Sequence, residues 1–467
     1  MHRVAARSLA ALWFVVAASA PAQEPAAAPP ASARPAVRNL VVVTLDTLRS
    51  DHLACYGYFR DTMPQLRALG ERSLRFARCL TPVAQTTPSH VSLFTGVAPD
   101  EHGVLSNHAL TADEGLATSA TLQTLAQALR AAGMRTGAFV AATPVKRASG
   151  LDQGFDVWSE PSNARRRGEE VVAEAARFIA ECGERPFFAW IHLYDAHDPL
   201  TSQWIPQHHL DRFSEEPTAA AWRAERGIVK QVIERGGRPH PITDSHHQYD
   251  GALRYLDENF GLLLAKLRSA GREEETVLVA IADHGTALGQ HDLYGHGMCW
   301  DELLRVPLYV HVPGVAPAVI ETPLSTLDVW PTVMGLAPAL ANAAFLAQCR
   351  GVDVLLHDHD PRPLFGVAAL KRGVASVTFG RWKLLRVRAN ELQLYDLEAD
   401  PHEQKDVARA NGEIVQRLTA LLDAELARQQ RARALHATSR KEGTSPDPKL
   451  LEELRALGYT DEGDDRP

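Results

Sequence analysis

The stretch NLVVVTLD, residues 39–46, decides the fold class of this 467-residue chain. It is a short run of mostly β-branched apolar residues that ends in an acid, and such a run predicts a buried strand. Similar runs occur at residues 136–142, 186–195, 276–283 and 307–312. Helical patterns separate them, at residues 121–133, 168–183 and 249–271. This alternation predicts an α/β fold with a large, mostly parallel sheet sandwiched by helices.

Three of the predicted strands end in polar side chains that can carry chemistry. Asp46 ends the first strand, the segment Asp195–His197 ends the third, and Asp283 with His284 ends the fourth. In open α/β sheets, ligands bind beyond the carboxyl ends of the strands. We therefore expect these side chains to converge on one site.

Composition changes along the chain predict its domain organisation. Residues 37–344 carry the strand and helix pattern of the α/β domain, and residues 200–247 within it are polar and rich in histidine. We interpret 200–247 as a lid or insertion with one helix near 219–234 and no clear strand. Residues 345–467 predict a smaller α+β domain, with three short strands over 376–401 and a helix over 412–435.

The N-terminal residues 1–22 have a basic start, an apolar run and small residues at the end. They predict a secretory signal peptide, and residues 23–36 predict an Ala/Pro-rich linker. The apolar run is short for a transmembrane helix, which needs about 20 residues. We therefore expect an exported protein, periplasmic or secreted, with no transmembrane anchor in the mature chain.

Charge and cysteine content exclude several classes of protein. The formal net charge is −8, which does not favour a nucleic-acid partner, because such proteins cluster lysine and arginine. The five cysteines have no CxxC spacing, so zinc fingers and a disulfide-rich scaffold are not expected. Oxidation of one pair in an exported protein is left open.

The segment QTTPSHVSLFTG, residues 85–96, reads first as the start of a helix. Ser and Thr are preferred just before a helix, and proline is tolerated at its first position, so the hydroxyls predict an N-cap. Metal-ligating residue types elsewhere in the chain favour a second interpretation, in which these hydroxyls belong to a catalytic site. Asp283-His284 offers one carboxylate and one imidazole, and His192, Asp195, His197, His291 and His296 occur nearby in the same pattern.

Several motifs together resemble the sulfatases of the alkaline phosphatase superfamily, and they follow one another in order over nearly the whole mature chain. They are residues 41–69, TTPSHVSLFTG (86–96), GLDQGFDVW (150–158), WIHLYDAHDP (190–199), residues 282–314, STLDVWPTV (325–333), residues 380–403 and ELRALGY (453–459). The resemblance implies the alkaline-phosphatase/sulfatase-like fold. It also implies hydrolysis of sulfate or phosphate esters.

Carried over position by position, the resemblance implies a site. Asp46, Asp283 and His284 match the ligands of a divalent metal, and Thr86 stands at the nucleophile position, two residues before the proline of the motif. His197 matches a histidine that contacts the sulfate or the leaving group, and His296 lies where many sulfatases place a lysine in that role.

The chain departs from the family pattern at the position that matters most. Sulfatases use a cysteine or serine that is oxidised to formylglycine, and Thr86 is neither of these. Where an arginine normally follows the proline, this chain has His90, and a second acidic ligand beside Asp46 is replaced by Thr47. The family's first substrate lysine has no clear counterpart, although the segment 141–150 contains Lys146.

A threonine can itself be the nucleophile, as the resemblance implies for phosphate-handling relatives with a metal-bound threonine at a helix N-terminus. Coordination to a divalent metal favours the alkoxide, and the helix N-terminus adds backbone N–H donors and a positive dipole end. Thr86 thus counts as both nucleophile and metal ligand, and His90, His197 and His296 are the further catalytic candidates.

One divalent ion is expected, with zinc or manganese favoured because His284 is a nitrogen ligand, and calcium or magnesium as alternatives. The favoured function is hydrolysis of a sulfate or phosphate ester on a small molecule, a glycan or a lipid headgroup. Two alternatives stay open. One is a phosphotransferase that uses the same covalent intermediate, and the other is an inactive sulfatase-like binding protein.

Overall fold

The computed structural model describes residues 37–107, 122–197, 199–200, 204–235, 238–356, 361–435 and 448–457. The predicted signal peptide (1–22) and the predicted linker (23–36) lie outside the described residues. Within these residues, no helix has both the length and the apolar character needed to cross a membrane. All five cysteines are described, and their thiols are free.

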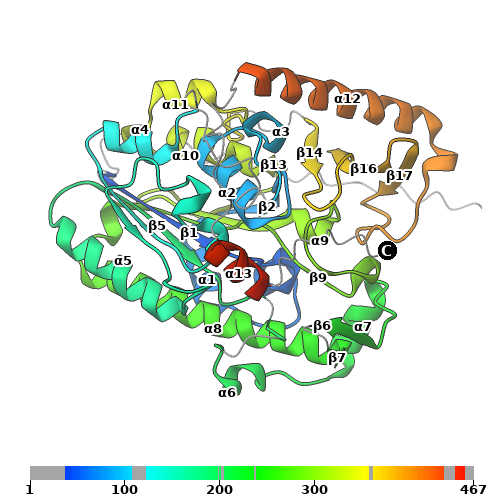
Figure 1. The fold of residues 1–467 in the computed structure, drawn as a ribbon, viewed down its shortest axis with the longest axis horizontal. Coiled ribbons are helices and arrows are strands. Elements are labelled where there is room, and N and C mark those ends of the chain that lie inside the picture. The colour runs from blue at the N-terminus through cyan, green and yellow to red at the C-terminus, as the bar shows by residue number, and fades with distance from the viewer. Residues whose placement is uncertain are drawn as a thin grey trace, which may run out of the picture. The chain divides into compact units, whose positions relative to one another are not determined.

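A mixed, mostly parallel sheet of nine strands forms the centre of the described chain (Figure 1). In spatial order its strands are β12 (Ala318–Ile320), β2 (Leu74–Leu80), β11 (Arg305–His311), β8 (Thr276–Ala282), β1 (Asn39–Leu45), β5 (Phe187–Leu193), β3 (Arg135–Phe139) and β4 (Val157–Ser159). Strand β13 (Leu324–Ser325) pairs with β2. The run from β8 to β4 is parallel, and β11 is antiparallel to both of its neighbours. The predicted α/β fold class is confirmed.

The register of the three central strands brings their ends to the same level. Leu45 of β1 lies opposite Leu193 of β5 and Ala282 of β8. All residues of these three strands are buried, as expected of parallel strands that helices cover on both faces. The residues that follow, Asp46 and Asp283, therefore leave the sheet side by side at its carboxyl edge.

Helices cover both faces of the sheet (Figure 1). Helices α5 (Gly168–Cys182) and α8 (Ile242–Ser269) lie together on one face, and α2 (Thr86–Thr95), α4 (Leu125–Ala131) and α10 (Val329–Leu336) lie on the other. Strand β2 is not among the runs singled out from the sequence. Its arginines and alternating burial hide it from a search for continuous apolar runs.

A second, antiparallel sheet follows in the C-terminal part. It orders β14 (Leu364–Val367), β15 (Ala375–Phe379), β16 (Trp382–Arg388) and β17 (Glu391–Asp396), and helix α12 (Gly412–Leu435) packs against it. The sequence predicts three of these four strands and the helix. Strand β14 also contacts the region of β2, because Val367 N donates to Pro82 O at 2.9 Å. The division at 344/345 stays a prediction.

The insertion over residues 200–247 contains more regular structure than the sequence suggests. Its predicted helix is α7 (Pro217–Glu225), which ends earlier than expected. Two short strands follow, β6 (Val232–Arg235) and β7 (Arg238–Pro241), so the expectation of no strand is wrong. These strands pair only with each other, and they are too short for a pattern search to detect.

Replacement of Phe260 by alanine tests the packing of α8. Phe260 is fully buried in the main core, so Phe260→Ala leaves a cavity, and we expect a loss of about 3–5 kcal/mol in the free energy of unfolding. Leu262 lies two residues away on the same helix with 40% of its surface exposed. Leu262→Ala should change stability by less than about 0.5 kcal/mol in the same denaturant titration. Equal losses in the two variants would contradict this packing of α8.

Candidate active site

Asp46, Asp283 and His284 meet at the carboxyl edge of the sheet. One possible ligand atom of each lies within 4.8 Å of those of the other two, and all three side chains are buried. Backbone amides hold the second carboxylate, since Thr47 N and His284 N donate to Asp283 Oδ1 at 3.1 and 2.8 Å. Thr47 has a φ of 56°, so the chain turns sharply directly after the first carboxylate.

The free atoms of this cluster suit a divalent cation. Asp46 Oδ1 and Asp283 Oδ2 are buried and have no hydrogen-bond partner among the described residues. With Nδ1–H of His284 assigned as the donor to Gly285 O at 2.8 Å, the Nε2 lone pair faces the carboxylates. Two orphaned carboxylate oxygens and one imidazole nitrogen form a donor set that accepts zinc or manganese.

The pKa values of both carboxyls are raised, as expected of two buried acids with no cation between them. Burial raises the pKa of Asp46 to about 6, against the weaker opposing effects of His284, Asp283 and Thr86. Burial and the neighbouring Asp46 also raise the pKa of Asp283. A bound cation would reverse both shifts, because it favours the charged form of each carboxyl.

Thr86 lies next to this cluster, at the first position of α2. Its Oγ1 is 3.3 Å from His284 Nε2. The helix begins two residues earlier than the sequence suggests, because Gln85 is the N-cap residue and Pro88 stands at the third position of the helix. The expectation of a Ser/Thr N-cap is therefore wrong at this helix. Proline is accommodated there because the third N–H of a helix has no partner inside the helix.

The start of α2 offers fewer backbone donors than a helix N-terminus usually does. Thr87 N donates to Asn107 Oδ1 at 2.8 Å, and Pro88 has no N–H group. Ser89 N already donates to Gln85 O. Backbone N–H groups therefore contribute less to anion binding here than expected. The positive end of the helix dipole remains available to a bound anion.

His197 and His296 come together from different segments beside the metal-ligand cluster. Their Nε2 atoms are 3.4 Å apart, and the His296 ring lies 4.4 Å from the His284 ring, centre to centre. Tyr194 stacks on His197 at 4.4 Å. One nitrogen of the pair must carry a proton for the contact to be a hydrogen bond, so the pair can hold or pass a proton at this edge of the site.

His90 lies one turn into α2 and below Thr86. Its Nδ1 donates to Thr86 O at 2.7 Å and lies 3.7 Å from Asp283 Oδ2, while burial lowers its pKa to about 4. The side chain is fully buried, and its Nε2 has no hydrogen-bond partner in the described parts of the chain. His90 is therefore a neutral imidazole that contacts the helix turn and a carboxylate at once.

His192 is a functional candidate that the sequence analysis noted without giving it a role. Ala141 N donates to its Nδ1 at 3.3 Å, so its Nε2–H points to Asp46 Oδ2 at 3.2 Å. Burial lowers its pKa to about 4, so it is neutral at pH 7. The sequence signal for this residue is a histidine in an otherwise apolar, fully buried strand, where a polar side chain needs a partner.

Asp195 and His291 are two other polar residues of the motifs. Among the described contacts, neither reaches Asp46, Asp283 or His284. Asp195 accepts from Gly168 N at 3.1 Å, at the start of α5. His291 stacks on Trp300 and faces Glu302, near Glu403, and these three polar side chains form a second possible metal-binding group. Lys383 Nζ lies 2.5 Å from Glu403, so that carboxylate already has a cation.

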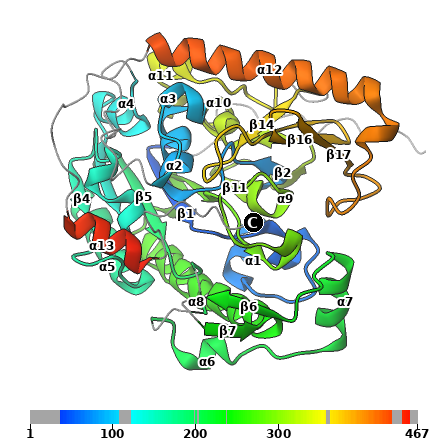
Figure 2. The ribbon, with the colours of Figure 1, turned by 45° about the vertical axis from the view of Figure 1, so that its right-hand side comes forward.

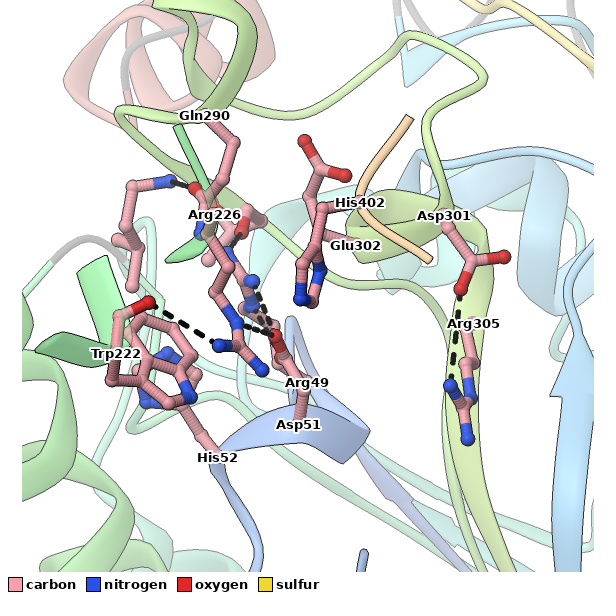
Figure 3. A network of polar contacts seen from close by, with 12 residues as sticks. Arg49, Asp51, His52, Trp222, Arg226, Gln290, Asp301, Glu302, Arg305 and His402 are labelled. Atoms are coloured by element: carbon pink, nitrogen blue, oxygen red, sulfur yellow. Dashed lines mark hydrogen bonds and ion pairs between the residues drawn. The ribbon is translucent and has the colours of Figure 1, made fainter. Parts of the chain in front are cut away.

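A buried network connects the insertion to the loop after His284 (Figure 3). Arg49 makes two bonds of 2.8 Å to Asp51, and its Nη1 donates to Thr286 O at 2.9 Å. From the insertion, Arg226 packs on Trp222 at 3.9 Å and reaches Asp51 at 3.4 Å (Figure 3). Arg226, directly after helix α7 of the insertion, is thereby connected through Asp51 and Arg49 to the loop that follows His284.

Comparison with known proteins identifies the family. The sulfatase family model matches residues 38–339, which is more than half of the chain, and the chain belongs to the sulfatase family. The Ulvan-active sulfatase of Formosa agariphila is 23% identical over 425 residues, covering 80% of this chain and 77% of the relative. The choline-sulfatase of Rhizobium meliloti is 24% identical over 420 residues and covers 74% and 77%.

Solved structures show the same fold. Ps i-CgsB, in complex with k-i-k-neocarrahexaose, is 18% identical with a TM-score of 0.65 and covers 91% of this chain and 98% of its own. The phosphonate monoester hydrolase of Agrobacterium radiobacter is 19% identical with a TM-score of 0.64 and covers 88% and 98%. Family and fold together make this chain an ester hydrolase of the sulfatase type, the class that cleaves sulfuric or phosphoric esters.

In chelator-treated protein, the two adjacent carboxyls should lower the free energy of unfolding once they are ionised. Because the pKa of Asp46 is higher in the folded than in the unfolded chain, the native state binds more protons between about pH 4 and pH 6. Asp46 should therefore contribute a loss of metal-free stability as pH rises through this window, opposite in sign to the gain that the buried, neutral His90 and His192 contribute. Asp46→Asn should remove this contribution, so the stability of the variant relative to the wild type should rise between about pH 4 and pH 6, which thermal unfolding in EDTA across pH 4–8 measures.

Metal should invert the ranking of the two proteins. Without metal, Asp46→Asn is expected to be at least as stable as the wild type at pH 7. With zinc or manganese present, only the wild type should gain stability, by mass action. An equal gain of the variant and the wild type with metal would remove Asp46 from the ligand set.

Proposed function

We propose that this chain is an exported, metal-dependent hydrolase of sulfate or phosphate esters in which Thr86 is the direct nucleophile. The observation that supports it best is the position of Thr86 Oγ1, 3.3 Å from His284 Nε2 and beside two orphaned carboxylate oxygens. A hydroxyl in this position lies beside the proposed metal ligands, where the metal could bind it as well. The hydroxyls of Ser89 and Thr47 also lie at this cluster, but they donate to the backbone carbonyls of Asp283 and Asp46, each at 2.8 Å.

Asp46, Asp283 and His284 would hold one divalent ion, with Thr86 as a further ligand. When bound, such an ion supplies Lewis acidity to the hydroxyl and to the ester oxygens. Around it, His192 donates to Asp46 and two backbone amides donate to Asp283, which orients both carboxylates. His90 supports the backbone carbonyl of Thr86 and thereby the start of α2.

In the first step, Thr86 Oγ1 attacks the sulfur or phosphorus atom of the ester. A bond forms between this oxygen and the central atom, and the bond from the central atom to the alcohol oxygen breaks. The hydroxyl proton passes from Thr86 to solvent water, and the alcohol oxygen accepts a proton from the His197–His296 pair as it departs. The product is a threonine ester of sulfate or phosphate together with the free alcohol.

His197 and His296 are placed to supply the proton to the leaving oxygen. Their Nε2 atoms lie 3.4 Å apart, so a proton on either nitrogen would be held between the two rings, where it could serve as a general acid. In the second step, water attacks the central atom of the threonine ester. The attacking water gives one proton to the histidine pair, the bond to Thr86 Oγ1 breaks, and the Thr86 oxygen takes a proton from solvent, so that the inorganic anion is released and the free hydroxyl is restored.

The chemistry of Thr86 favours a phosphorus ester over a sulfate ester. Its β-methyl group prevents conversion to formylglycine, the group that the sulfatase resemblance implies for sulfate release. A phosphonate monoester hydrolase shares the fold, and sulfatases are the relatives in sequence. We propose that the alcohol part is a small molecule, a glycan or a lipid headgroup.

Replacing the Thr86 hydroxyl by a methyl group tests the mechanism. Thr86→Val keeps the side-chain shape, and we expect kcat to fall by about 10⁴-fold or more, the scale of losing a nucleophile. Aryl sulfate, aryl phosphate monoester and phosphate diester substrates are compared with zinc, manganese or calcium. Turnover of the phosphorus esters should disappear in the variant while its melting temperature is retained.

Thr95→Val is the matched control on the same helix. Thr95 Oγ1 bonds only its own helix, at Val91 O, so this variant should keep wild-type turnover. Wild-type activity in Thr86→Val would overturn the threonine mechanism. Turnover of the sulfate ester alone by the wild type would overturn the preference for phosphorus esters.

A further inference from the structure

The last described helix packs beside the candidate active site, although it lies far from it in the sequence. Helix α13 (Pro448–Ala456) contacts the segment around Thr143–Val145, which follows strand β3 (Figure 2, red). Leu450, Leu454 and Leu457 join the main hydrophobic core. The sequence analysis did not single out this helix, and only the motif ELRALGY, residues 453–459, marked the region.

Glu453 makes the polar part of this contact. Its Oε2 accepts a hydrogen bond from Thr143 Oγ1 at 2.9 Å and pairs with Lys146 Nζ at 2.6 Å. All three side chains are buried. A second contact of the helix, Lys449 Nζ to Ser162 O at 3.1 Å, lies on the neighbouring segment.

The loop that Glu453 holds supports the candidate active site at two places. Ala141 N donates to His192 Nδ1, and His192 Nε2 reaches Asp46 Oδ2. Pro144 O accepts from Thr87 Oγ1 at 2.7 Å, on the residue directly after the proposed nucleophile. One loop therefore contacts the support of a metal ligand and the first turn of α2.

We propose that Glu453 is a positioning residue of this site. Its carboxylate fixes the loop 141–146, and the loop fixes His192 behind Asp46 and the first turn of α2 at Thr86. The effect on turnover rests on the proposed function, whereas the effect on metal binding rests on the ligand cluster alone.

The energetics of buried ion pairs favour a positioning role over a purely stabilising one. Taking two charges out of water costs several kcal/mol each, and apolar residues of similar volume often stabilise a fold as well or better. The three leucines already attach α13 to the core. What the charged pair adds is a fixed direction, because one carboxylate oxygen binds two donors from the same loop.

The test compares three full-length variants with the wild type. Glu453→Ala removes the pair, Glu453→Gln keeps an acceptor without the charge, and Glu452→Ala is the matched control at an exposed neighbour. Zinc affinity is measured by competition with a chelator, and kcat and KM are measured with the best ester substrate. All measurements are made at 25 °C on variants that circular dichroism first confirms to be folded.

We expect Glu453→Ala to weaken zinc binding and to lower kcat by about 10-fold each, the usual scale for residues behind a metal ligand, with KM changed less. Glu453→Gln should lie between it and the wild type, and Glu452→Ala should match the wild type. Because the effect runs through His192, the zinc-affinity losses of Glu453→Ala and His192→Ala should be less than additive.

Two results would overturn the proposal. One is a Glu453→Ala protein with wild-type zinc affinity and kcat, whatever its melting temperature. The other is full additivity with His192→Ala. If Glu453→Ala does not fold, Lys146→Met removes the same ion pair, and the same two outcomes decide. A wild type that binds zinc without hydrolysing any ester contradicts the proposed function, and the zinc measurements still decide the role of Glu453.

Discussion

Two buried carboxylates that the fold forces together are the constraint on which the site depends. The register of β1 and β8 delivers Asp46 and Asp283 to the same point at the carboxyl edge of the sheet. Each retains one oxygen without a partner in the described chain, and burial raises both pKa values. Such a pair is costly unless a cation joins it, so a divalent ion bound between the two carboxylates would stabilise this edge of the sheet.

The groups around this pair are neutral, so only a bound cation would balance the negative charge of the two carboxylates. The groups that contact the carboxylates are backbone amides and the imidazoles of His284, His90 and His192, and burial lowers the pKa values of the last two to about 4. Charged residues lie farther out, as in the Arg49–Asp51–Arg226 network of Figure 3 and the Lys146–Glu453 pair. These outer pairs fix the loops that carry the inner groups.

Much of the architecture was predictable because it follows from local patterns. Continuous apolar runs located the central strands, and the rule that ligands gather at carboxyl ends of parallel strands grouped Asp46 with Asp283 and His284. The pairing of His192 with Asp46 was not predictable, because it depends on which face of β5 the side chain occupies. Strand β2 and the two strands of the insertion escaped detection because their sequences lack a strong period.

Contacts between segments that are distant in the sequence were also not predictable. The helix start at Thr86 depends on Asn107 and Gln85 as well as on the local Thr-Thr-Pro pattern, so local capping rules placed it two residues late. Glu453 meets its partners across more than 300 residues of chain. No pattern within a window of one helix or strand contains that information.

The most direct test of the central claim is the mass of the peptide that contains Thr86 after rapid acid quenching during turnover of an aryl phosphate. The account predicts a fraction of this peptide that carries one added phosphoryl group, with fragmentation placing the group on Thr86. It also predicts that the unreacted peptide has the mass of unmodified threonine. A phosphoryl group on another residue, or steady turnover with no adduct on Thr86 at any quench time, would contradict it.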